Sequence, residues 1–300
     1  MILNSSLSLM DENYFNFQLE MADLQTYHNV YSSALEITNE SDNIFVKIKN
    51  AIVNFFKKIV NWIRGFFKKE VKETSSKNVE NKNMAKNTNT KNKEFPITVS
   101  GGDNIIYDLS AEDLNEIANT EKTNELFDEL QTFKDFVNNA QTRTKEQLMY
   151  FVKNFMDGMD VTSPNFDSAM VGFKSECKKI KEDLISTVKS EDSKIKLTPG
   201  GKINSQQELN KVINQCNDKL LEKALSDLEK NSNALEKLCN DIGSKVNHLT
   251  LDDKEIVRIL NNTFTITNIS INLFLDMANV LKNVAKKNID TFNSLLKQLQ

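Results

Sequence analysis

Glycine and proline are scarce in this sequence, and their scarcity restricts the fold. The 300 residues include eight Gly and three Pro. A chain of many short β-strands needs these residues at its frequent turns. We therefore predict a mainly α fold.

Cysteine and histidine are too few and too scattered to indicate a metal centre. Cys177, Cys216 and Cys239 show no CxxC spacing, and each stands where a helical pattern would carry an apolar residue. A zinc site needs further ligands, but the two histidines, His28 and His248, lie in separate regions. We expect three buried thiols, no metal and no cofactor.

Motifs for catalysis, secretion and membrane spanning are also missing. Neither GxSxG nor HExxH occurs. The Gly201-Lys202 pair fails as a P-loop, because Lys196 stands where the first glycine is needed and Ile203 replaces the Mg²⁺-binding Ser or Thr. No uncharged apolar run reaches about 18 residues, and the N-terminus does not resemble a secretory signal. We expect a non-enzymatic protein with no catalytic residue, no signal peptide and no transmembrane span.

The charges that are present are sorted along the chain. Residues 1–42 contain seven acidic residues and no Lys or Arg, whereas residues 43–69 contain seven Lys or Arg and no acid. The net charge of −4 gives no general affinity for nucleic acid. The asymmetry indicates that the acidic block shields the basic one within the fold, or that each block has an external partner.

The basic block, residues 43–69, has the periodicity of an amphipathic helix. Its five Phe and the only Trp of the chain fall on one side, and most Lys, Arg and Asn residues fall on the other. Such a helix either lies on an anionic membrane surface, docks in the groove of a partner, or packs on its own chain. The candidate membrane- or partner-binding residues are Phe45, Lys47, Phe55, Phe56, Lys57, Lys58, Trp62, Arg64, Phe66, Phe67, Lys68 and Lys69. Nucleic acid is disfavoured as the partner, because DNA cannot cover the continuous apolar side.

Three regions are predicted along the chain. In residues 1–69, a helix over 11–38 forms an antiparallel hairpin with 43–69 in the resting protein and holds its apolar side until something opens it. Residues 70–94 contain few apolar residues and no periodicity, so we predict a disordered linker. Residues 95–300 form a multi-helix bundle that starts with a short β-hairpin-like pair over 95–107.

Apolar periodicity and capping signals predict five helices in the third region. The signals include Ser110 to Asp113, Ser205 to Glu208 and Thr250 to Asp253. The last helix is the most apolar and is predicted to be the central helix of the bundle. The predicted spans are 111–139, 143–157, 165–190, 204–248 with a break near Asn231, and 251–298.

The order of parts resembles a family of phage proteins. An acidic helix followed by FVKIKNAIVNFFKKIVNWIRGFFKK and a polar linker is similar to the N-terminal region of uncharacterised virion structural proteins of large tailed phages of AT-rich Gram-positive hosts. The resemblance covers roughly residues 10–70. It implies a structural or capsid-internal component, located in a virion or the host cytoplasm.

Three functions follow as hypotheses. The first is a non-enzymatic virion protein whose residues 43–69 contact a membrane surface or a neighbouring subunit. The second is a membrane-perturbing helical toxin or effector, and the third is a scaffolding or assembly protein that docks an acidic partner through the basic helix. The expected partners are other virion or assembly proteins or an anionic membrane, and oligomer formation is left open.

Overall fold

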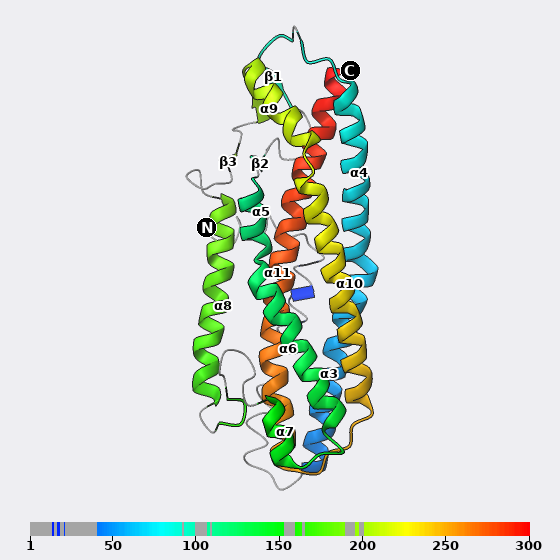
Figure 1. The fold of residues 1–300 in the computed structure, drawn as a ribbon, viewed down its shortest axis with the longest axis vertical. Coiled ribbons are helices and arrows are strands. Elements are labelled where there is room, and N and C mark those ends of the chain that lie inside the picture. Colours follow the sequence, from blue (N-terminus) through cyan, green and yellow to red (C-terminus); the bar gives the residue numbers. More distant parts are fainter. Residues whose placement is uncertain are drawn as a thin grey trace.

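The computed structural model describes residues 41–91, 93–99, 107–108, 110–152, 160–163, 166–189, 196–197 and 201–300, together with Tyr14, Phe17, Gln18 and Met21. Its helices are packed lengthwise beside one another (Figure 1), and the predicted mainly α fold with a helical bundle is confirmed. The helices are α3 (Ser41–Trp62), the π-helix η1 (Ile63–Phe67), α4 (Lys68–Asn87), α5 (Ala111–Ala118), α6 (Thr120–Asn139), α7 (Lys145–Val152), α8 (Phe166–Lys189), α9 (Gln206–Asn217), α10 (Leu220–Asn247) and α11 (Lys254–Leu299).

Helix α11 is the central helix of the bundle, as predicted for residues 251–298. It runs through the middle of the molecule (Figure 1) and packs against α4, α6, α8 and α5. In the part of the chain that the structure describes, α11 is the one helix long and apolar enough to cross a membrane, and 89% of its apolar window is buried inside the protein. Its burial on several sides is that of a core helix.

Helices α3, η1 and α4 follow one another without a break and form a long rod over Ser41–Asn87. The prediction of a disordered linker over 70–94 is therefore wrong for residues 70–87, which lie in α4 and pack against α11, α10 and α9. The buried residues of α4 recur at steps of three and four but are mostly polar or small, so a count of apolar residues misses them. They are Val71, Thr74, Asn78, Asn81 and Ala85.

The predicted division into three regions does not describe this structure. Helix α3 packs most extensively against α10, which lies in the predicted third region. One hydrophobic core joins side chains of both regions. Most of the predicted helix over 11–38, and its pairing with the lysines of 43–69, lie outside the described residues. Tyr14, Phe17 and Met21 are helical and buried.

The predicted boundaries of the other helices are partly correct. The capping box of Ser110 and Asp113 is present, and Ser205 caps α9. The predicted helix over 111–139 is interrupted at Asn119, which has a left-handed backbone with φ of 39°. Asp253, not Thr250, caps α11: its carboxylate accepts hydrogen bonds from the backbone N–H groups of Glu255 and Ile256. The break in 204–248 lies at Asp218, not near Asn231.

Four two-residue strands form two antiparallel pairs. Strand β1 (Ile97–Thr98) pairs with β4 (Lys202–Ile203), and β2 (Tyr107–Asp108) pairs with β3 (Lys196–Leu197). Strand β1 lies within the predicted span and β2 begins at its last residue, but the two do not pair with each other. Their partners β4 and β3 were not predicted and are distant in sequence. The pairing of Ile97 with Ile203 places Ile203 in the core, where its side chain is fully buried, and this burial favours the distant partner.

Candidate functional site on the basic helix

The aromatic residues predicted as a membrane or partner contact lie in the core. Phe45, Phe55, Phe56, Trp62 and Phe67 are buried, and Phe66 is partly buried. The Phe55 ring packs edge-to-face on Phe264 of α11 at 5.1 Å, and Phe56 lies 6.3 Å from Phe133 of α6, both measured between ring centroids. The expectation that this apolar side faces a membrane or a partner is therefore not met in this conformation. Of the open interpretations, packing on its own chain describes the position of these side chains.

The basic residues of the same helix lie on its outer side. Lys47, Lys57 and Lys69 are exposed, and Lys58 is partly exposed. Arg64 of η1 and Lys68 of α4 both pair with Glu236 of α10 (Arg64 Nε to Glu236 Oε1, 2.5 Å). Partial burial raises the pKa of Glu236, but hydrogen bonds from Lys68 and Arg64 together outweigh that effect and hold the pKa below its usual 4.5.

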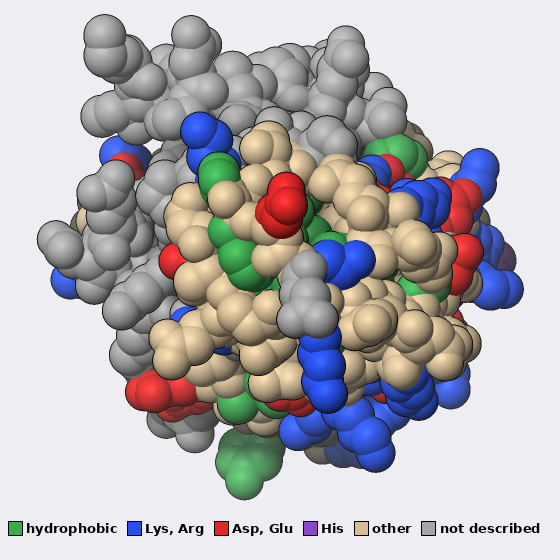
Figure 2. Space-filling model, turned by 90° about the horizontal axis from the view of Figure 1, so that it is seen from above, with side chains coloured by type: hydrophobic (Ala, Val, Ile, Leu, Met, Phe, Trp, Pro, Cys, Tyr) green, Lys and Arg blue, Asp and Glu red, His purple; other side chains and the backbone are tan. Residues whose placement is uncertain are grey.

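The outer side of the rod is a concentrated source of positive charge. We call Lys47, Lys57, Arg64, Lys69 and Lys72 the basic face; all five residues are exposed. Residues 43–94 contain thirteen Lys or Arg and four Glu, a net charge of +9, so the rest of the chain carries −13 to reach the total of −4. Looking onto the end of the bundle that carries α9, Figure 2 shows most visible Lys and Arg side chains along one edge.

Three lysines of the basic face have no acidic partner among the residues that the structure describes. Among the described residues, no ion pair involves Lys57, Lys69 or Lys72. Their ammonium groups therefore remain available to an external acidic surface.

A second set of charges lies beside η1 around one buried lysine, and the sequence patterns did not reveal it. The side chain of Lys282 in α11 is fully buried, and its ammonium group pairs with Glu70 of α4 at 2.5 Å. The same ammonium lies 5.1 Å from the ring centroid of Phe66 and 5.6 Å from that of Phe67. Lys286 also pairs with Glu70, at 3.2 Å. A single Lys within the apolar stretch of α11 was the one available signal.

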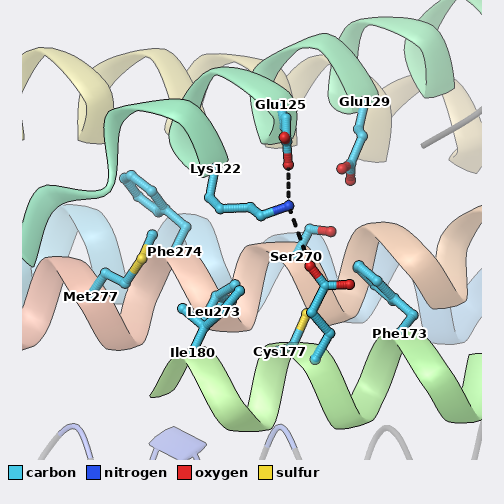
Figure 3. A pocket seen from close by; sticks show the side chains of 11 residues that line it. Lys122, Glu125, Glu129, Phe173, Cys177, Ile180, Ser270, Leu273, Phe274 and Met277 are labelled. Atoms are coloured by element: carbon cyan, nitrogen blue, oxygen red, sulfur yellow. Dashed lines mark hydrogen bonds and ion pairs between the residues drawn. The ribbon is translucent and has the colours of Figure 1, made fainter. Parts of the chain in front are cut away.

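The cysteines are not arranged for nucleophilic chemistry. Burial raises the pKa of Cys216 to about 11, and burial together with the nearby Glu176 raises that of Cys177 to about 12. Cys177 lies in a small pocket between α6, α8 and α11, where Lys122 pairs with Glu125 and Glu176 (Figure 3). The pocket volume is about 10 Å³, roughly the room that one water needs. These thiols stay protonated near neutral pH.

Neither metal clusters nor relatives supply further guidance. Within the described parts of the chain, no group of three or more His, Cys, Asp or Glu side chains is placed to hold a metal ion. Comparisons with protein-family models, curated proteins and solved structures found no match. The basic face is therefore the feature of the molecule that bears most directly on function.

Proposed function

We propose that the protein is a non-enzymatic virion structural or capsid-internal protein that docks on an acidic surface of a neighbouring subunit through the basic face. One observation carries the proposal. The amphipathic helix buries its aromatic side in the bundle and presents its Lys and Arg residues to solvent. The assignment to a phage particle rests on the resemblance of residues 10–70 described above.

The exposed side of the helix favours a protein surface over insertion into a membrane. Interfacial helices bind lipid through buried apolar area as well as charge, and the aromatic area here is already buried. Lys47 and Lys72 are separated by about 38 Å along the rod, at about 1.5 Å per residue. Single exposed ion pairs contribute little, but an extended array of one sign orients an acidic partner and accelerates its association.

Cross-linking inside purified particles tests this proposal. A carbodiimide joins a lysine amine directly to a carboxylate in contact with it, so it reports ion pairs between subunits. We expect Lys57, Lys69 and Lys72 to form intermolecular cross-links to Asp or Glu of a neighbouring protein, detected by mass spectrometry. The Lys57→Glu/Lys69→Glu/Lys72→Glu variant should reduce incorporation into particles severalfold, because it reverses the charge of the docking surface.

The matched control is the variant Lys174→Glu/Lys178→Glu/Lys179→Glu. These three lysines are exposed on α8, which lies on the opposite side of the bundle from α4 (Figure 1). The control variant should be incorporated normally. Absence of the protein from particles, or equal loss with both variants, would contradict the proposal.

A membrane-perturbing role is the second candidate, and one observation favours it. The two most lipid-compatible helix surfaces, those of α3 and α11, are packed on each other through Phe55, Phe56 and Phe264. Opening of the bundle would release both surfaces together. This role predicts dye leakage from anionic vesicles by the intact protein, with little leakage from zwitterionic ones. Failure to release dye from either kind of vesicle would exclude it for the isolated protein.

A further inference from the structure

A cavity of about 270 Å³ lies between α5, α6, α10 and α11, where α11 is seen between α5 and α10 in Figure 1. All the side chains that line it belong to residues that the structure describes. Its floor is apolar and buried, because Leu114, Leu228, Phe274, Ala278 and Leu281 are each at most 5% exposed. Protein interiors contain few voids larger than a water molecule, so a cavity of this size calls for an explanation.

Small side chains create this space. Ala118, Ala224 and Ala278 line the cavity, one each from α5, α10 and α11. A larger apolar side chain at any of these positions would fill part of it. An empty apolar cavity is unfavourable, because the atoms that line it lose the contacts of close packing. The space is therefore either a packing gap or room for a ligand, and the chemistry of its rim favours a ligand.

The wall on the side of α5 and α6 is held in a fixed shape. Ala118 and Thr120, on either side of the left-handed Asn119, both line the cavity. The Asn119 side chain accepts a hydrogen bond from the backbone N–H of Lys122 at 3.2 Å, and the Thr123 hydroxyl donates to the Ala118 carbonyl at 3.2 Å. The break between the two helices is thus a defined structure, and the cavity is formed without a ligand, as most ligand sites are.

The rim of the cavity offers a cation and amide groups. Lys223 of α10 lines it and is exposed, and no ion pair involves this lysine in the part of the chain that the structure describes. Asp227 lies on the same rim, but its carboxylate pairs with Lys230 at 3.7 Å. Asn115 and Asn231 add side-chain amides. The positive end of the α10 helix dipole acts at the same place, since Lys223 belongs to the first four residues of that helix.

We propose that the cavity binds a medium-chain monocarboxylate, with its hydrocarbon body on the apolar floor and its carboxylate at Lys223. An apolar cavity of about 150 Å³ holds benzene, so the volume here has room for about ten non-hydrogen atoms, the size of octanoate. The amides of Asn115 and Asn231 supply hydrogen-bond donors for the carboxylate oxygens. This inference does not depend on docking through the basic face, none of whose residues lines the cavity.

Calorimetric titration of the intact protein at neutral pH tests the proposal, with octanoate as the probe. We expect saturable binding of a single octanoate by each chain. 1-Octanol has the same body with a neutral head and should bind about threefold more weakly, because an ion pair with an exposed lysine contributes modestly. Acetate has the head without the body and should not bind detectably. Absence of saturable octanoate binding at millimolar concentration, or equal affinity for acetate, would overturn the proposal.

Two pairs of variants place the ligand in the cavity. Ala224→Leu should weaken the binding of octanoate and of 1-octanol at least about tenfold without lowering the unfolding temperature, because the new side chain occupies existing space. Ala234→Leu, at an exposed site of α10 away from the cavity, is its matched control and should leave binding unchanged. Lys223→Gln should remove the preference for octanoate over 1-octanol, whereas Lys237→Gln, at another exposed site of α10, should preserve it.

The variants also give clear grounds for rejection. Octanoate binding that survives Ala224→Leu, or that falls equally in Ala234→Leu, would place the ligand elsewhere. A more stable Ala224→Leu, together with no binding by the unsubstituted protein, would show that the cavity is only a packing gap. If Ala224→Leu does not fold, the lysine pair still decides, because the same preference for octanoate in Lys223→Gln and Lys237→Gln would overturn the proposal.

Discussion

Helices α3 and α4 are two halves of one rod, but they meet the rest of the bundle through different chemistry. The inner side of α3 carries large aromatic and aliphatic side chains such as Phe55 and Phe56, which fill space between α10, α6 and α11. The inner side of α4 carries Thr74, Asn78 and Asn81. The Asn81 side-chain amide donates to the carbonyl oxygen of Ile289 at 2.7 Å. Asn81 thus makes a directional contact between α4 and α11, whereas the Thr74 hydroxyl donates to the Glu70 carbonyl within α4 itself.

The two halves of the rod therefore depend on different forces. Burial of a large side chain is non-directional and follows the area removed from water. A buried amide or charged group stabilises the fold only when its partner is correctly placed. Removing one partner leaves the other buried without a partner and destabilises the protein. We therefore expect large, shape-dependent effects of substitution in α3 and smaller, partner-dependent effects in α4.

The largest effect should come from α3. Phe56 is 1% exposed, and a Cβ placed on Gly243 of α10 would lie 3.2 Å from the Phe56 Cβ, so the two helices are in close contact there. Phe56→Ala should lower the free energy of unfolding by about 4 kcal/mol through lost burial and the cavity left behind, measured by urea denaturation. Val46→Ala, at an exposed site of the same helix, should change it little. A Phe56→Ala loss below about 1 kcal/mol would contradict the packing described.

An intermediate effect should come from the charged contact of α4 with α11. Glu70→Gln removes the carboxylate that faces the fully buried Lys282 and should destabilise the protein by about 3 kcal/mol. Lys282→Met should lose less than about 1 kcal/mol, because Glu70 keeps Lys286 and the methionine fills similar space among apolar neighbours. Both are measured by urea denaturation, with Glu73→Gln, at an exposed site of α4, as control. If Glu70→Gln and Lys282→Met lose the same free energy of unfolding, Lys282 is not buried against Glu70 as described.

The smallest effect should come from the buried amide of α4. Asn81→Ala removes the hydrogen bond to Ile289 and should cost about 1 kcal/mol. Asn83→Ala is the control, at an exposed position of the same helix. It raises the helix propensity as Asn81→Ala does but removes no buried contact. The difference between the two variants in thermal denaturation therefore isolates the buried contact. Equal unfolding temperatures for Asn81→Ala and Asn83→Ala would show that the Asn81 amide does not contribute to the packing of α4.

Much of the fold follows from patterns in the sequence. The elements that were predicted wrongly are those whose structure does not follow the periodicity of apolar residues. The amphipathic helix over 43–69 and the central helix over 251–298 are strongly periodic in apolar residues, and both are present. Helix α4 was missed because Thr and Asn occupy its buried positions. The interruption at Asn119 was missed because apolar periodicity continues on both sides of it, and asparagine tolerates the left-handed conformation without a glycine signal.

The candidate site was predictable in position but not in orientation. A helical wheel separates the aromatic side from the basic side, and no single-sequence pattern decides whether the chain itself covers the aromatic side. The partners of that side, such as Phe264 and Phe133, lie far away in the sequence. The pair of Glu70 and Lys282 joins residues 212 positions apart, a distance across which a local pattern gives no information.

The π-helical turn η1 is the one place in the rod where its length can change by a residue. The backbone N–H of Lys68 reaches the carbonyl of Ile63, five residues back, so this turn holds one residue more than an α-helical turn. Deleting Gly65, whose Cβ position faces open space, would therefore let this turn close into a regular α-helical turn, and α4 would keep its orientation on the bundle. The same deletion inside α4, directly after Val71, would turn everything after it by about 100° and move Asn81 away from Ile289 of α11. The rod can therefore lose a residue at η1 but not within α4.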